Sequence, residues 1–242
     1  MNATDVLDRL RAAEVKPHGF IANASNHTLL VQVGDPADGV AAVYKPRAGE
    51  RPLWDFPSGT LCDREVAAYV VSAFLGWDVV PPTALRDHAP MGPGSMQLFV
   101  PHDPRAHYFA LVDDPTTHEP LARMALFDLL VNNADRKASH VLRADDGSLW
   151  GCDHGLTFHA DPKLRTVIWE LGGHRIDGSL RADLGRLAAA LADTDSAVTH
   201  ELEELLGPDE LRALGERASL LRGLRALPDV DADRRPYPWP PL

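Results

Sequence analysis

Apolar and polar residues follow one another along the first hundred positions in short runs typical of strands separated by turns. Residues 28–33 and 40–45 are two strand candidates, joined by the Gly-, Asp- and Pro-containing turn at 34–39. Three further strand candidates are 20–22, 79–85 and 94–100. The pattern therefore predicts an antiparallel sheet, with Lys45 at the end of its third strand.

Two helices are predicted in the same part of the chain. The first covers residues 5–15. The second begins at Thr60-Leu61-Cys62-Asp63, which fits an N-terminal capping pattern, and ends at Gly76. Glu65 lies in the first half of this second helix.

The chain after residue 117 has mostly helical spacing. The predicted helices cover 121–131, 180–192, 197–206 and 209–227. A polar, Pro-broken stretch at 101–105 separates the two parts, which favours an α+β chain with two lobes. We predict a β-rich N-lobe over 1–100, a helical C-lobe over 101–227 and an irregular, Pro-rich tail over 228–242.

Composition limits the classes of partner. The 242 residues are 45% apolar and 24% charged, which is ordinary for a globular protein, and the length is enough for a large core. The formal net charge of −11 argues against nonspecific binding to nucleic acid or to an anionic bilayer. We therefore expect neither nucleic acid nor peripheral membrane contact.

The number of cysteines and the residues near the N-terminus indicate the cellular compartment in which the protein is expected. Cys62 and Cys152 are too few for a disulfide framework, which favours a reducing compartment. Asp5, Asp8 and Arg9 interrupt the apolar residues near the N-terminus, so no signal peptide is expected. No apolar run reaches the length of about 18 residues that suggests a membrane span. We expect a cytoplasmic protein.

The candidate chemistry lies in the polar loop 132–140, after the apolar run 121–131. Asp135, Lys137 and His140 stand at offsets zero, two and five, the spacing that kinase catalytic loops use. There an acid orients the attacking hydroxyl, a cation lies near the transferring phosphoryl group, and a third side chain binds metal. Asp153 follows a predicted hairpin and would be the main Mg²⁺ ligand.

Two earlier residues complete the pattern. Lys45 would reach the nucleotide phosphates from the sheet, and Glu65 would hold it by an ion pair from the helix. Each feature alone is common: an Asp-Arg-Lys run is most often a solvated turn. The shared order of strand lysine, helix glutamate, acid loop, hairpin and second acid predicts a bilobal protein-kinase-like fold.

Several segments together resemble the small bacterial phosphatidylinositol 3- and 4-kinase-like family, which is related to the type II phosphatidylinositol 4-kinases and more distantly to HipA-type kinases. The resemblance covers roughly residues 18–180. The segments that carry it are Val43-Tyr44-Lys45-Pro46, Arg64-Glu65-Val66-Ala67-Ala68-Tyr69, Leu75-Gly76-Trp77-Asp78-Val79-Val80-Pro81-Pro82-Thr83, the loop 132–140, and Asp153-His154-Gly155-Leu156.

This resemblance implies a role for each matching residue. Asp135 would be the catalytic acid, assisted by Lys137, and Asp153 the metal-binding aspartate. ATP would be held by Lys45, Glu65, a phosphate-covering turn with Ser25, Asn26 and Thr28, and a hinge strand with Gln97, Phe99 and Val100. The implied cofactors are ATP and Mg²⁺, with Mn²⁺ as an alternative.

The chain departs from the family pattern in two ways. His140 stands where such kinases have Asn, and its softer nitrogen would favour Mn²⁺ as the bound metal. Alternatively, His140 would only hydrogen-bond a phosphate and leave a single-metal site. The phosphate-covering segment has no glycine between Ile21 and Val33. A transition-metal site is a separate alternative, built from Asp153 with His140, His154, His159 and His174.

The sequence thus predicts an ATP-dependent phosphotransferase whose acceptor is a protein or a small polar molecule rather than clearly a lipid. Two alternatives stay open. The chain could be a nucleotide-binding pseudokinase with a regulatory role, or it could transfer AMP on the same fold.

Overall fold

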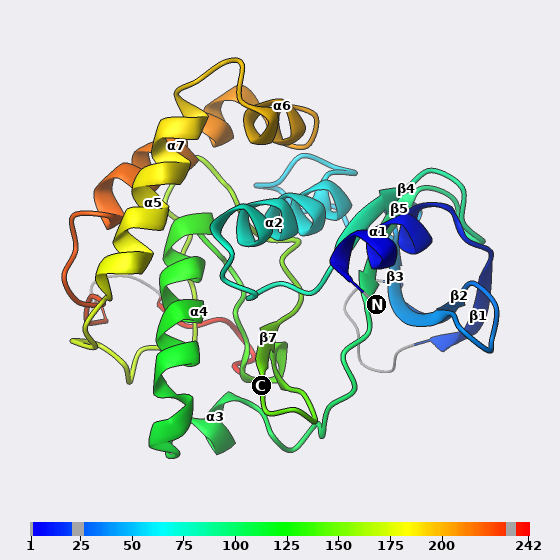
Figure 1. Cartoon of the computed structure of the whole chain (residues 1–242), viewed down its shortest axis with the longest axis horizontal. Helices are drawn as coiled ribbons and strands as arrows, with labels where there is room; N and C mark the ends of the chain where they lie inside the picture. Colours follow the sequence, from blue (N-terminus) through cyan, green and yellow to red (C-terminus); the bar gives the residue numbers. More distant parts are fainter. Residues whose placement is uncertain (1, 21–26, 231–235) are drawn as a thin grey trace.

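The computed structural model describes residues 2–20, 27–230 and 236–242. The N-terminal part is a five-stranded antiparallel sheet in the order β1-β2-β3-β5-β4 (Figure 1). Its strands are β1 (Val15–Phe20), β2 (Leu29–Val33), β3 (Val40–Pro46), β4 (Thr83–Arg86) and β5 (Gly94–Leu98). Helix α1 (Ala3–Ala12) packs against this sheet, and Val6 and Leu10 share a core with Val31 and Tyr44.

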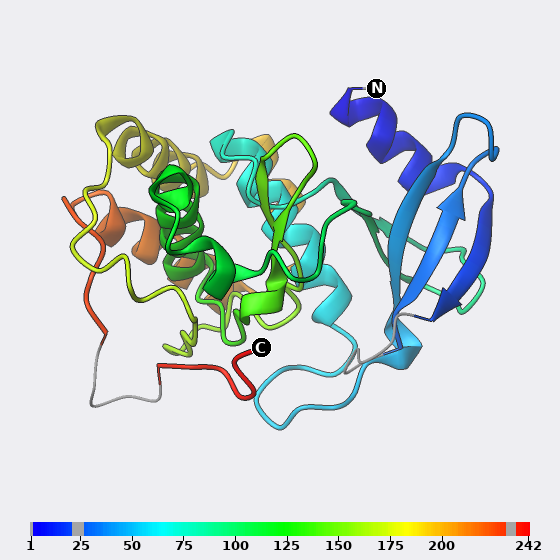
Figure 2. The same cartoon turned by 90° about the horizontal axis from the view of Figure 1, so that it is seen from below.

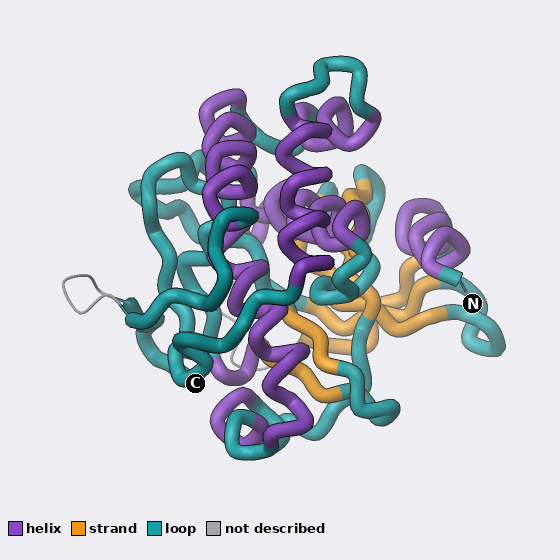
Figure 3. Tube along the Cα trace, turned by 60° about the vertical axis from the view of Figure 1, so that its left-hand side comes forward, coloured by secondary structure: helices purple, strands orange, loops and turns teal. Residues whose placement is uncertain are grey.

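The rest of the chain consists of helices joined by long loops, as Figure 3 shows by colour. Its helices are α2 (Leu61–Leu75), α3 (Tyr108–Leu111), α4 (His118–Val131), α5 (Gly178–Leu191), α6 (Ala197–Glu203) and α7 (Pro208–Leu221). Short 3-10 turns cover Arg47–Gly49, Pro115–Thr117 and Ala138–His140, and β6 (Val141–Arg143) pairs with β7 (Leu149–Gly151). The predicted α+β architecture, with a strand-rich first part and a helical second part, is confirmed. Among the described residues, no helix has both the length and the apolar character needed to cross a membrane.

Helix α2 belongs to the core of the helical part, although it precedes β4 and β5 in the chain. Val66, Val70 and Val71 share one apolar cluster with residues of α4, α5 and α7. Arg64 is 1% exposed and fixes the start of α2: it donates to the carbonyl of Thr157 (2.7 Å) and to Glu210 Oε1 (2.6 Å). The division between lobes at residues 100 and 101 stays a prediction.

Several predicted boundaries are wrong for identifiable reasons. The first helix ends at Ala12 instead of residue 15, because Val15 pairs with Val33 in the sheet. The strand predicted over 79–85 begins only at Thr83, because Ser72 Oγ accepts from the amides of Val79 (3.0 Å) and Val80 (3.2 Å). Residues 21 and 22 of the strand predicted over 20–22 lie outside the described residues.

The predicted N-cap position of α2, Thr60, is correct, but its side chain does not cap the helix. Thr60 Oγ1 donates to the carbonyl of Pro57 (2.8 Å) and accepts from no backbone amide of the helix. Instead Glu50, from the preceding loop, accepts from the amides of Leu61 (3.2 Å) and Cys62 (2.9 Å). A carboxylate at a helix N-terminus also suits the helix dipole. At the other end the prediction is correct, since Gly76 has the left-handed conformation (φ 70°).

Candidate active site

The polar loop after α4 is held by its own amide side chains. Asn132 ends α4 in the left-handed conformation (φ 53°), and its Nδ2 donates to the carbonyls of His159 (2.8 Å) and Asp161 (2.7 Å). Asn133 is fully buried, and its Oδ1 accepts from the backbone amide of Asp135 (3.0 Å). The two asparagines therefore fix the direction in which the Asp135 side chain leaves the loop.

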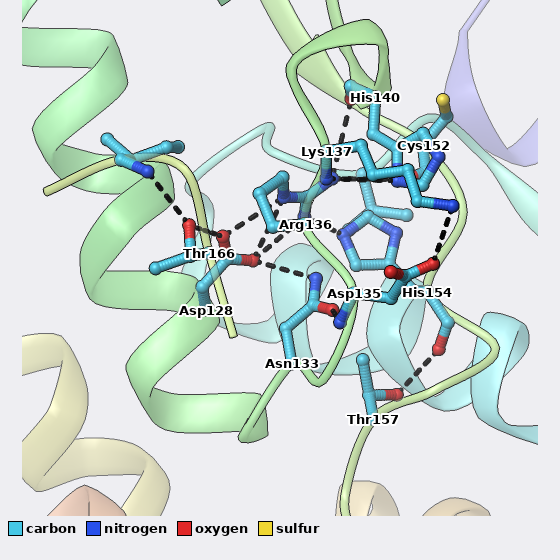
Figure 4. Close-up of polar contacts among 12 residues, drawn as sticks. Asp128, Asn133, Asp135, Arg136, Lys137, His140, Cys152, His154, Thr157 and Thr166 are labelled. Atoms are coloured by element: carbon cyan, nitrogen blue, oxygen red, sulfur yellow. Dashed lines mark hydrogen bonds and ion pairs between the residues drawn. The ribbon is translucent and has the colours of Figure 1, made fainter. Parts of the chain in front are cut away.

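A buried ion pair between Arg136 and Asp128 connects this loop to α4 (Figure 4). Arg136 and Asp128 are both 0% exposed and pair at 2.9 Å. Arg136 also donates to the carbonyl of Cys152 (2.9 Å) and contacts His154 Nε2 (2.6 Å), so it ties α4 to the segment that carries Asp153. Asp128 is thus a satisfied structural acid.

Asp153 is turned toward the sheet by an unusual backbone conformation. It follows β7 and has φ 59°, a left-handed value that is uncommon for a residue other than glycine. Its Oδ1 accepts from Lys45 Nζ at 2.9 Å, across the gap between the two parts of the chain. Such outliers occur preferentially at functional sites.

Lys45 contacts two carboxylates at once. Its Nζ pairs with Glu65 of α2 as well as with Asp153, and Glu65 Oε2 accepts from the amide of His154 (3.0 Å). Burial alone would lower the pKa of Lys45, but Asp153 and Glu65 outweigh it and raise the pKa above its ordinary value. Burial alone would raise the pKa of Asp153. The electrostatic effect of Lys45, followed by that of His140, outweighs burial and lowers this pKa below its ordinary value. The ammonium and the carboxylate are therefore both charged at neutral pH.

Asp135 faces the same cavity from the polar loop after α4. Its carboxylate lies 3.2 Å from Lys137 Nζ and is a quarter exposed. Burial raises the pKa of Asp135 to about 6, against the opposing effect of Lys137. A carboxylate that titrates this close to neutral pH is suited to accept a proton from a hydroxyl.

His140 lies beside Asp153, with Nε2 3.4 Å from Asp153 Oδ2. Burial lowers the pKa of His140 to about 4, so the imidazole is neutral at pH 7. Its Nδ1 accepts from the amide of Lys137 (3.4 Å), so the ring proton lies on Nε2, which faces Asp153. The Asp153 carboxylate fits a divalent cation, whereas His140 would ligate one only after that proton moves.

The alternative transition-metal site is not formed. Within the residues that the structure describes, no three His, Cys, Asp or Glu side chains gather to hold a metal ion. His154 is buried against Arg136, His174 pairs with Glu119 (3.2 Å), and His159 packs edge-on against Phe56.

The structure contains a cavity of about 410 Å³, and some of the predicted site residues line it while others do not. It is lined by Thr28, Lys45, Glu65, Asp135, Lys137 and Asp153. Gln97, Phe99 and Val100 are not part of its lining: Gln97 bonds Thr83 (2.9 Å), the Phe99 amide donates to Ala41, and the Val100 carbonyl contacts His102. Ser25 and Asn26 lie outside the described residues.

Other residues of the cavity were not among the predicted site residues. The loop before α2 contributes Arg51 and Leu53, the segment after Asp153 contributes Arg165, and the tail contributes Tyr237 and Trp239. Figure 2 shows the loop and the tail side by side at one edge of the molecule. In the sequence, Trp239 is marked only by its place in a Pro-rich tail.

Comparison with solved structures identifies the class of fold. Hydra Fam20, in a structure with sugar, superposes with a TM-score of 0.61 at 15% identity and covers 91% of this chain and 87% of that one. The Golgi casein kinase with Mn and ADP bound superposes with a TM-score of 0.55 at 14% identity, covering 91% and 74%. The fold is therefore kinase-like, as predicted, whereas the narrower resemblance to phosphatidylinositol kinases stays a prediction.

Sequence comparison identifies the family. Protein Rv2133c of Mycobacterium tuberculosis (strain ATCC 25618 / H37Rv) is 38% identical over 264 residues, covering 96% of this chain and 93% of that protein. The chain belongs to the family of that protein. No family model matches the sequence.

Proposed function

We propose that this protein is an ATP- and divalent-cation-dependent kinase that phosphorylates a hydroxyl group. The observation that carries the proposal is the double contact of Lys45 with Glu65 and Asp153, in a cavity that also holds Asp135. A phosphate-binding lysine, its helix partner, a metal-binding acid and a catalytic acid are the parts that phosphoryl transfer needs.

Each of these side chains has a role in the proposed reaction. Lys45 is held ready by Glu65 and binds phosphate oxygens of ATP. Asp135 orients the acceptor hydroxyl and accepts its proton, and Lys137 offsets negative charge near the transferring group. A divalent cation at Asp153 would neutralise charge on the phosphates. Catalysis is then positioning and charge stabilisation, with no covalent intermediate on the protein.

A first experiment tests nucleotide and metal binding. Mg²⁺ and ATP at about 100 times the Kd should stabilise the wild type by about 2.7 kcal/mol, a rise in Tm of roughly 5–10 °C. Asp153→Asn keeps the side-chain shape but loses the charge, so most of this rise should disappear in differential scanning fluorimetry. Asp195→Asn, on an exposed turn, is the matched control and should behave as wild type.

The same titration separates the alternatives. Stabilisation by ATP without metal, and without any product, would favour a pseudokinase. Transfer of AMP would appear in the intact mass of the product. No stabilisation by any nucleotide would contradict the kinase proposal and the pseudokinase alternative together.

A second experiment tests the role of His140 beside Asp153. His140→Ala removes the side chain that contacts this carboxylate and should raise the Mg²⁺ concentration for half-maximal activity roughly tenfold. His140→Asn offers an amide oxygen, a harder donor, and should restore Mg²⁺ use and lower the preference for Mn²⁺ over Mg²⁺. The check is a titration of each variant with both metals. Identical metal curves for Ala, Asn and wild type would show that His140 has no role at the metal.

A further inference from the structure

The last residues of the chain form a fixed wall of the proposed active site. This C-terminal strap, residues 236–242, is anchored at both ends. The carbonyl of Pro236 accepts from the amide of Thr166 (2.9 Å), and the carbonyl of Pro241 accepts from the amide of Ala138 in the catalytic loop (2.8 Å). Tyr237, Pro238 and Trp239 lie between these anchors and line the cavity. The position of the wall is therefore set before any acceptor binds.

The strap presents aromatic surface that the protein itself does not cover. Trp239 is 79% exposed and Tyr237 is 47% exposed, although both line the cavity that holds Asp135. An indole or phenol ring offers a flat apolar face together with a polar N–H or O–H group. Such a surface suits a ligand with both C–H faces and hydroxyl groups.

The charges around Asp135 favour an anionic group on that ligand. Arg51, Lys137 and Arg165 line the cavity. Of its acids, Glu50 caps α2, Glu65 and Asp153 hold Lys45, and Asp135 pairs with Lys137. The charge of Arg165 acts on Asp135, but Arg165 forms no ion pair with a carboxylate of the described chain. A guanidinium binds phosphate or carboxylate in a bidentate manner.

The strap also limits the size of the acceptor that can reach Asp135. It is bonded to the catalytic loop at Ala138, three residues after Asp135, and lies beside the loop before α2 (Figure 2). Its residues therefore occupy surface beside the loop that carries Asp135 and enclose the cavity on that side. The cavity of about 410 Å³ is shared between the phosphates of ATP at Lys45 and the acceptor at Asp135, so the space left for the acceptor suits a small molecule.

From these observations, and resting on the proposed kinase activity, we propose that the strap and Arg165 form the binding site for a small polyhydroxylated acceptor with an anionic group, such as a sugar or polyol phosphate. A hydroxyl oxygen of this acceptor forms the new bond to the γ-phosphorus of ATP. The bond from that phosphorus to the β,γ-bridging oxygen breaks, ADP leaves with the electron pair, and the hydroxyl proton passes to Asp135. Trp239 packs against the carbon face of the acceptor, and Arg165 binds its anionic group.

The test measures ADP release from ATP and Mg²⁺ by the full chain, with and without a mixture of hexose 6-phosphates, pentose 5-phosphates and hexitol phosphates. The same sugars and polyols without phosphate form the neutral arm, and two further arms use acidic peptides and phosphatidylinositol vesicles. We expect stimulation above the acceptor-free rate by the phosphorylated mixture alone, with doubly phosphorylated products found by mass spectrometry.

Variants test whether Arg165 and Trp239 form the acceptor site. For each variant, the rate of ADP release with acceptor is divided by the rate of the same variant without acceptor. Arg165→Ala should raise the acceptor concentration for half-maximal stimulation roughly 10–100-fold. Trp239→Ala should raise it roughly tenfold, and Trp239→Phe should restore most of the loss. Trp54→Ala and Arg212→Ala, exposed residues outside the cavity lining, are the controls and should match wild type.

The outcomes separate this proposal from the one it rests on. ADP release that depends on Asp153, without stimulation by the phosphorylated mixture, would overturn the acceptor site and leave the kinase proposal standing. Stimulation by peptides or vesicles instead, or stimulation unchanged in Arg165→Ala and Trp239→Ala, would also overturn the acceptor site. No ADP release and no nucleotide binding would contradict the kinase proposal itself.

Discussion

Replacement of Asp135 by asparagine is expected to lower kcat roughly 10²–10⁴-fold, the usual contribution of general acid–base catalysis. The amide keeps the size of the side chain but cannot accept a proton. Nucleotide affinity should change much less, because Lys45 contacts Glu65 and Asp153, not Asp135. The measurement is ADP release under saturating ATP, with the Tm shift by ATP as the check on binding. An unchanged kcat would exclude Asp135 as the proton acceptor.

The pH profile tests the same carboxylate without a substitution. Burial raises the pKa of Asp135 to about 6, and the ionised form is the one that accepts a proton. As pH falls through about 6, kcat/KM should therefore decline, by about tenfold per pH unit well below the pKa. Lys137 opposes the rise in this pKa, so Lys137→Met should shift the acidic limb to higher pH as well as lower the rate. A limb near pH 4 in both proteins would contradict the assignment.

Replacement of Asp128 by alanine is expected to lower the free energy of unfolding by about 3–5 kcal/mol, because it leaves a buried arginine without its counter-ion. Arg136 is 0% exposed, and Asp128 also accepts from Asn133 (3.0 Å) and Thr166 (3.3 Å). Urea unfolding followed by circular dichroism measures the loss.

A double variant separates the ion pair from simple loss of packing. Asp128→Leu with Arg136→Met removes both charges and keeps apolar volume, so it should recover a large part of the lost stability. Activity should stay low in the double variant, because Arg136 also holds the carbonyl of Cys152, next to Asp153. If Asp128→Ala were as stable as wild type, the pair would have no structural role.

The features that the sequence predicted correctly depend on local chemistry. The turn at 34–39, the glycine after α2 and the hairpin before Asp153 are signalled by residues next to one another. The predictions failed where a distant partner decides the structure. Val15 leaves the first helix because Val33 pairs with it, and Glu50 caps α2 from another segment.

The residues of the candidate site also fall into a group that the sequence predicted and a group that it did not. Lys45, Glu65, Asp135 and Asp153 were predicted from their order in the chain, and the structure brings them to one cavity. Arg165 and Trp239 have no such order: a single arginine in a loop and a tryptophan near the end of the chain carry no spacing or periodicity. Trp239 reaches the cavity because the amides of Thr166 and Ala138 bind the strap. Arg165 reaches it because its backbone bonds Asn133 and Arg136 of the polar loop.

The anchoring of α2 by Arg64 limits how this cleft can open. In many kinases the corresponding helix swings outward and breaks its contact with the lysine, which switches the enzyme off. Here Arg64 fastens the helix to Thr157 and Glu210, so Glu65 and Asp153 share one rigid frame. A hinge motion would carry the sheet, α1 and Lys45 away from that frame together. Under the proposed function, phosphate bound at Lys45 would then bridge the sheet to Asp153 and hold the two parts of the chain together.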